Sequence, residues 1–106
     1  MANNYKNVKT DLSTTNLTSI LTVPTGSTCI IKSIIISEDT GSTPTIDITL
    51  VESSNIFSLF KNESLAANQT KELLTQPLVI QAGQELKAQA SAGNQLHIVV
   101  SYLEIT

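Results

Sequence analysis

Two stretches of the chain alternate apolar and polar residues one by one. In residues 45–50, Ile46, Ile48 and Leu50 alternate with threonine or aspartate. Residues 84–92 have the same period, with apolar side chains at Leu86, Ala88, Ala90 and Ala92. Because successive side chains of a strand point to opposite faces, this period predicts two strands that each bury one face.

Further segments have the length and composition of strands and are separated by clusters of Gly, Pro, Asn, Asp or Ser. They are residues 5–10, 17–23, 28–37, 56–61, 71–75, 78–81 and 95–105. The helix candidate, residues 63–74, has no 3.6-residue apolar period and contains Asn68 and Thr70, so we interpret it as a loop between strands. The pattern predicts an all-β fold: an antiparallel β-sandwich of about eight strands with jelly-roll or Greek-key connections.

Two short segments resemble each other and are predicted to be turns at the corners of the sandwich. They are "VPTG", residues 23–26, and "IQAG", residues 80–83. Pro24 fixes its own φ angle and lacks a backbone donor, whereas Gly26 and Gly83 permit a positive φ. These three residues are therefore predicted to have a structural role.

Length and charge limit the classes of function. The 106 residues can form one domain with one core, and we divide them into a polar N-terminal segment or arm, residues 1–16, and a single β-sandwich domain, residues 17–106. The net charge of −3, with six lysines and no arginine, excludes the basic patch that nucleic acid requires. The sequence has neither an apolar leader nor a run of about 18 apolar residues, so we expect no membrane span and synthesis in a cytoplasm.

Four motifs resemble those of small β-sandwich virion proteins of tailed phages. They are "LTVPTGSTCIIKSIIIS", "TIDITLVES", "PLVIQAGQELKAQAS" and "LHIVVSYLEI", which lie within residues 17–106. The resemblance implies a virion structural protein made in the host cytoplasm, acting as a capsid decoration or cement subunit. Similar domains occur in phage necks, tails and fibres, and these locations are the alternative.

Two predicted strands, residues 28–37 and 95–105, are apolar on both faces. A two-layer sandwich covers one face of each sheet, so the other face requires a loop, the N-terminal segment or a partner subunit. On a strict period of two, the side chains on that second face form the candidate interface: Ile31, Ile35, Val99, Leu103 and Ile105.

The expected partners follow from the resemblance and from this candidate interface. They are the major capsid protein or other virion subunits, together with further copies of the chain. We expect a cyclic homo-oligomer, and specifically a trimer, because three-fold positions recur in capsid lattices and closed point groups dominate assemblies.

Residues suited to catalysis or metal binding are sparse. His97 is the only histidine, and Cys29, the only cysteine, lies in an apolar run that predicts a buried, inert thiol. Four carboxylates surround one predicted loop and strand: Glu38, Asp39, Asp47 and Glu52. Their oxygens could hold a weakly bound Ca²⁺, but we favour a solvated acidic loop. We predict no enzymatic activity, no metal site and no cofactor.

A glycan-binding module is the alternative from another functional class, because sandwich domains often bind sugars on a sheet face. Such a site generally offers an aromatic platform, and the aromatic residues are Tyr5, Tyr102, Phe57 and Phe60. We interpret the two phenylalanines as core residues, so a glycan site is expected to depend on Tyr102.

Overall fold

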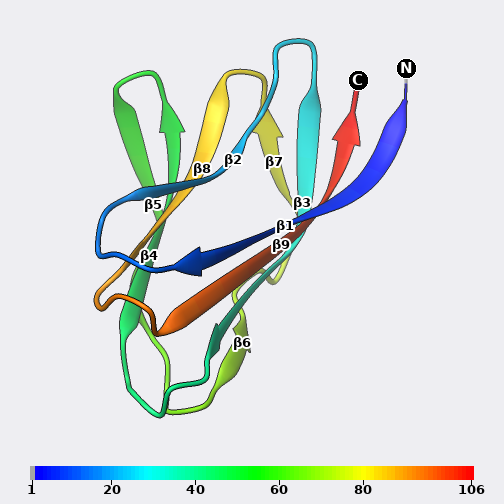
Figure 1. The fold of residues 1–106 in the computed structure, drawn as a ribbon. Helices are drawn as coiled ribbons and strands as arrows, with labels where there is room; N and C mark the ends of the chain where they lie inside the picture. Colours follow the sequence, from blue (N-terminus) through cyan, green and yellow to red (C-terminus); the bar gives the residue numbers. More distant parts are fainter. Residues whose placement is uncertain (1) are drawn as a thin grey trace.

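The chain passes repeatedly between two antiparallel sheets in the computed structural model, which describes residues 2–106 (Figure 1). The first sheet contains β1 (Asn3–Leu12), β9 (Leu96–Ile105), β3 (Thr28–Glu38) and, both beside β3, β6 (Thr70–Glu72) and β7 (Leu78–Gln81). The second sheet has the order β2 (Thr18–Thr22), β8 (Gln84–Ala90), β4 (Thr45–Glu52) and β5 (Asn55–Ser64). The predicted antiparallel β-sandwich is confirmed.

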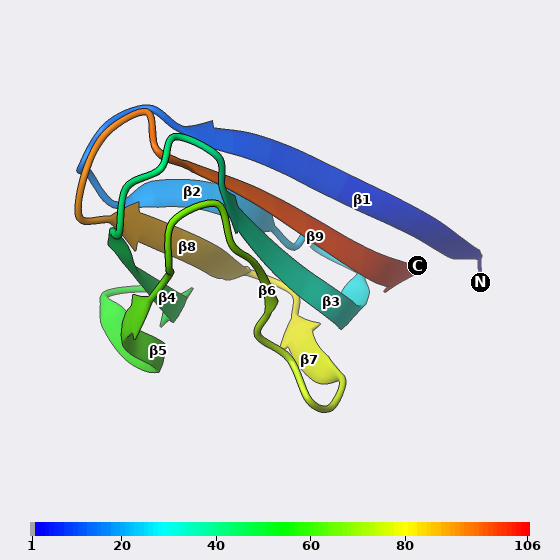
Figure 2. The ribbon, with the colours of Figure 1, turned by 90° about the horizontal axis from the view of Figure 1, so that it is seen from below.

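Local structure also agrees with the sequence patterns. The segment 63–74 contains the end of β5, a loop and the short strand β6, in place of a helix. Within residues 2–106, no helix has the length and hydropathy that crossing a membrane requires. Part of the polar segment 1–16 forms β1, which pairs along the whole of β9 as an edge strand (Figure 2).

The core lies between the two sheets and is almost entirely aliphatic. β9 illustrates how the strands supply this core, because its residues alternate between buried and half-buried along the whole strand. Its buried residues belong to the same core cluster as those of β4 and β8 in the second sheet. The largest fully buried apolar side chains are Leu12, Ile31, Ile34, Ile36, Ile46, Ile48, Leu65, Ile80, Leu86, Leu96 and Ile98.

A bulge in β3 reverses the alternation of its side chains. The pairing with β9 shifts between Ile31 and Ser33, so Lys32 is the extra residue. As a result Ile31 is fully buried in the core together with Ile34, while Ile30 lies on the outer face with Ile35. The prediction that Ile31 shares the outer face with Ile35 is therefore wrong, because strict alternation does not continue through an inserted residue.

The two glycine turns lie beside each other at one end of the sandwich. Gly26 and Gly83 both have a φ of 84°, a conformation that glycine adopts without the strain of a Cβ atom. Val23 links the turns, because its N–H donates to the Gln84 carbonyl and its carbonyl accepts from the Gly83 N–H, each at 3.0 Å. Ser27 N–H closes the first turn by donating to the Pro24 carbonyl at 3.1 Å.

Replacing Thr49 by valine is expected to stabilise the fold. Thr49 is buried in β4, and its Oγ1 has no hydrogen-bond partner among the described residues. A valine of similar shape removes this unsatisfied hydroxyl, so the free energy of unfolding should rise by about 1 kcal/mol. Urea denaturation measures the change; a lower midpoint would show instead that the hydroxyl has a partner.

Candidate functional site

The outer face of the first sheet carries an apolar row that crosses four strands. Tyr5 of β1 lies opposite Leu103 of β9, Leu103 lies opposite Ile30 of β3, and Ile30 lies opposite Val79 of β7. Tyr5 is 79% exposed and Val79 is 53% exposed, while the two central residues are half-buried by their neighbours. We call these four residues the outer band. No strand of the second sheet covers it, since that sheet packs on the opposite face (Figure 2).

The structure brings four of the five predicted interface residues to this face. Leu103 belongs to the outer band and Ile105 lies beside it. Val99, four residues from Leu103 along β9, lies opposite Ile35. All four are half-buried, whereas Ile31 is in the core. The sequence patterns missed the contributions of Tyr5, Ile30 and Val79. These residues become neighbours only when strands distant in the sequence pair, so the register of β9 and β3 is needed to identify the outer band.

The inner face at the same end of the sheet is closed by a charged pair. Lys6 Nζ lies 2.7 Å from Glu104 Oε1, and the hydrogen bond between them raises the pKa of Lys6. The Cys29 thiol lies nearby, and burial raises its pKa, as the prediction of an inert thiol requires. Tyr102 is also buried here, so it cannot serve as the platform of a glycan site.

The β4–β5 hairpin exposes a second group of apolar side chains. Ile56 is 60% exposed and Phe57 is 53% exposed, near the turn of the hairpin. The prediction that Phe57 is a core residue is wrong, because β5 is an edge strand whose pairing with β4 shifts twice; Phe60 packs against the core. Further along β5, this strand and the β6–β7 segment line a groove of about 360 Å³ that includes Leu59, Phe60, Leu74 and Leu78.

His97 joins three segments of the chain through two carboxylates. Its Nδ1 lies 2.5 Å from Asp11 Oδ1 on β1, and its Nε2 lies 3.2 Å from Asp39 Oδ2 in the β3–β4 loop. The hydrogen bond with Asp11, with a smaller contribution from the charge of Asp39, raises the pKa of His97. Both nitrogens are occupied by these partners, so the arrangement is an ionic link rather than a site with a free ligand position.

We expect this link to weaken as the pH rises. The folded-state pKa of His97 lies above its ordinary value of 6.5, so its stabilising effect is complete below about pH 6.5 and is lost as the pH rises through the folded-state pKa. NMR titration of the imidazole should give a pKa above 6.5 that falls towards 6.5 in Asp11→Asn. A titration identical in the two proteins would contradict the link.

The other carboxylates are engaged separately. Glu38 accepts from the backbone N–H groups of Gly41 and Asn68 at 3.0 and 2.9 Å, while Asp47 accepts from the Asn62 N–H at 2.7 Å and lies 3.3 Å from Lys61 Nζ. No group of three or more His, Cys, Asp or Glu side chains in residues 2–106 is arranged to hold a metal ion. The possible calcium cluster therefore does not form in this part of the chain.

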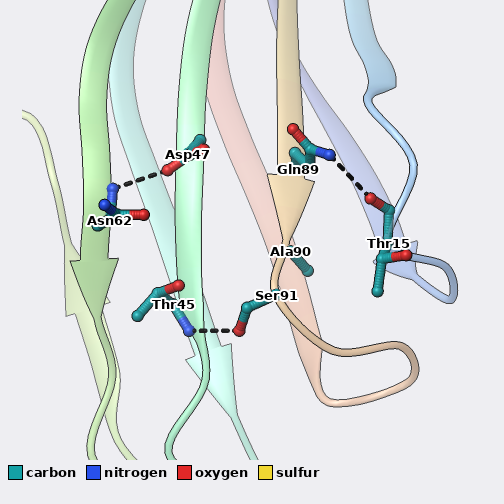
Figure 3. Close-up of a pocket in the computed structure, with 7 residues that line it drawn as sticks. All are labelled: Thr15, Thr45, Asp47, Asn62, Gln89, Ala90 and Ser91. Atoms are coloured by element: carbon teal, nitrogen blue, oxygen red, sulfur yellow. Dashed lines mark hydrogen bonds between the residues drawn. The ribbon is translucent and has the colours of Figure 1, made fainter.

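A shallow polar pocket of about 370 Å³ lies on the second sheet (Figure 3). Asp47 and Asn62 line one side, while Gln89 and Thr15 line the other, joined by a 3.0 Å hydrogen bond from Gln89 Nε2 to the Thr15 carbonyl. Ser91 Oγ accepts from the Thr45 N–H at 2.9 Å at its lower edge. The lining offers hydroxyl, amide and carboxylate groups but no aromatic ring.

Comparison with known proteins identifies a structural likeness. No protein-family model and no curated protein sequence matches the chain. Two solved structures, each described as a pentameric capsid protein isolated from metagenomic phage sequences, align with a TM-score of 0.51 and 18% sequence identity. The alignments cover 94% of this chain but 59% and 60% of those chains, so this chain spans less than two thirds of their length. At this identity the likeness establishes the fold.

Proposed function

We propose that the chain is a phage virion structural protein that acts as a capsid decoration or cement subunit. The observation that carries this proposal is the similarity of almost the whole chain to phage capsid proteins. The sequence motifs that resemble tailed-phage virion proteins support it independently. The alternation of β1 to β4 between the two sheets supports the jelly-roll form of the sandwich.

The surface chemistry is consistent with assembly. The outer band and the β4–β5 hairpin expose large apolar side chains, and contacts with neighbouring subunits would cover them. We propose a homo-oligomer that also contacts the major capsid protein, and a role that involves no catalysis.

Co-sedimentation with purified phage shells tests this function. We expect the protein to pellet with expanded shells up to a fixed stoichiometry and to remain in the supernatant without them. Val99→Lys, which places a charge on the outer face, should reduce the bound amount, whereas Lys87→Ser on the second sheet should not. A protein that never pellets with shells would contradict decoration. Binding of the protein at one vertex or on the tail would instead support the neck, tail or fibre alternative.

Glycan binding remains a second candidate because of the polar pocket, whose hydroxyl, amide and carboxylate groups suit a polyhydroxylated ligand. Its site would depend on Asp47 and Asn62 in place of Tyr102. A glycan array with a hit that Asn62→Ala abolishes would favour this function, and an array without hits would remove it.

A further inference from the structure

We infer that copies of this chain associate head to tail, with the outer band of one copy in contact with the β4–β5 hairpin tip of the next. The hairpin tip is defined as Ile56 and Phe57 with the neighbouring carboxylates Glu52 and Glu85. This inference goes beyond the proposed function, because it names the two surfaces of a contact that purified protein should form without any other virion component.

Exposed apolar side chains gather on these two surfaces. Among the described residues, the large apolar side chains classed as exposed are Tyr5, Leu17, Ile56, Phe57 and Val79. Two belong to the outer band and two to the hairpin tip; Leu17, in the β1–β2 loop, is the least exposed of the five. Exposed apolar patches of this kind mark interaction sites.

The hairpin tip exposes apolar side chains on both of its faces. Ile56 and Phe57 are consecutive residues of a strand, so their side chains point to opposite faces of the hairpin. Because both are more than half exposed, the chain's own sandwich covers neither face. Figure 1 places this hairpin on the side of the molecule opposite the N-terminal half of β1, which carries Tyr5, so one copy cannot bring the two surfaces together.

The outer band lies on a broad sheet face. Strands are spaced about 4.8 Å apart with a rise of about 3.4 Å per residue, so the outer face of β1, β9 and β3, together with the four residues of β7, measures about 570 Å². An interface that buries this area on each partner exceeds the roughly 1,000 Å² in total expected of a specific contact. The half-buried Val99, Ile35 and Ile105 extend the apolar surface on this face.

Charges near the two surfaces are complementary. Lys32 lies beside Tyr5 of the outer band, and Lys9 lies opposite Val99 further along the same face. Neither lysine forms an ion pair within residues 2–106, and Lys9 Nζ is bonded to the neutral Asn7 side chain at 3.1 Å. At the hairpin tip, Glu52 accepts from Gln84 and Glu85 accepts from Ser19 and Thr22, all neutral groups. Lys87 lies two residues from Glu85 along β8, so Glu52, Glu85 and Lys87 together carry one net negative charge.

Contact between two outer bands would satisfy these observations less well. It would leave Ile56 and Phe57 exposed, and it would bring the lysines of both copies to one interface. A contact between two different surfaces is heterologous, and such contacts form rings when the rotation closes. The number of subunits in the ring is then set by the angle between the two surfaces.

Complementation between two broken variants tests the pairing. Tyr5→Asp damages only the outer band, and Phe57→Asp damages only the hairpin tip; both side chains are exposed, so each monomer should keep the wild-type circular dichroism spectrum. We expect wild-type protein at high micromolar concentration to sediment as a ring whose mass is a multiple of 11.4 kDa, and each variant alone as a monomer. An equimolar mixture should form a complex of two chains, because one intact band then meets one intact tip.

Three results would overturn the inference. Wild-type protein that remains monomeric would exclude the contact, Phe57→Asp protein that still self-associates would assign association to bands alone, and a mixture that stays monomeric would exclude band-to-tip pairing. Leu17→Asp is the matched control, since it charges an exposed apolar residue outside both surfaces and should assemble like the wild type. Because no shells are present, failure here leaves the co-sedimentation test of the proposed function unaffected.

Discussion

Ile31→Ala is expected to destabilise the protein by about 2–5 kcal/mol, whereas Ile30→Ala, one residue earlier, should change the stability by less than about 1 kcal/mol. Ile31 is fully buried between the sheets, so truncation leaves a cavity in the core. Ile30 is half-buried on the outer face, where water and neighbouring side chains can fill the space. The two residues are adjacent in sequence and identical in type, so the difference reports only the face on which each lies.

Urea denaturation of the two variants in the Tyr5→Asp background, which we expect to be monomeric, measures this difference without a contribution from association. Ile34→Ala should resemble Ile31→Ala, because the bulge at Lys32 places both residues on the buried face. Equal effects at Ile30 and Ile31, or a larger effect at Ile30, would contradict the bulge and would indicate strict alternation along β3.

Glu38→Gln should lower the melting temperature more than any other carboxylate-to-amide change among the described residues. Glu38 is 2% exposed and accepts hydrogen bonds from the N–H and hydroxyl of Thr40 and from the N–H groups of Gly41 and Asn68. These bonds connect the β3–β4 loop to the β5–β6 loop. The hydrogen bond from the Thr40 hydroxyl is the largest of the influences that lower the pKa of Glu38 to about 2.

The Glu38 carboxylate should also make the stability of the fold depend on pH in the acid range. The folded-state pKa of about 2 lies below the ordinary value of 4.5, so the stabilisation is complete above about pH 4.5 and is lost as the pH falls towards 2. Melting temperatures measured between about pH 2 and 6 should fall with pH less steeply in Glu38→Gln than in the wild type. Glu52→Gln, which alters an exposed carboxylate, should keep the wild-type slope; equal slopes in all three proteins would contradict this role of Glu38.

Much of the fold could be predicted because the strands bury one face each. The alternation around Ile46 and Ile48 and the positions of Gly26 and Gly83 are local properties of the sequence, and local rules describe them. The bulge at Lys32 has one weak local sign, because strict alternation would place this lysine on the same buried face as Ile34. A period of two applied to the apolar residues alone places Ile31 on the wrong face.

The candidate site was less predictable because it depends on contacts between distant segments. Tyr5 and Leu103 are partners in the β1–β9 pairing, and His97 meets Asp11 and Asp39 only after three segments come together. The exposure of Phe57 depends on the position of β5 at the edge of its sheet. Strand order and register therefore supply what residue type alone cannot.

Quantitative mass spectrometry of gradient-purified phage particles, produced in cells that also express this coding sequence, tests the proposed virion role most directly. A capsid decoration subunit should be present in many copies per particle, in a constant ratio to the major capsid protein, and should remain with the shell when tails are removed. Absence of the protein from purified particles, while it is abundant in the infected-cell lysate, would contradict a structural role in the virion.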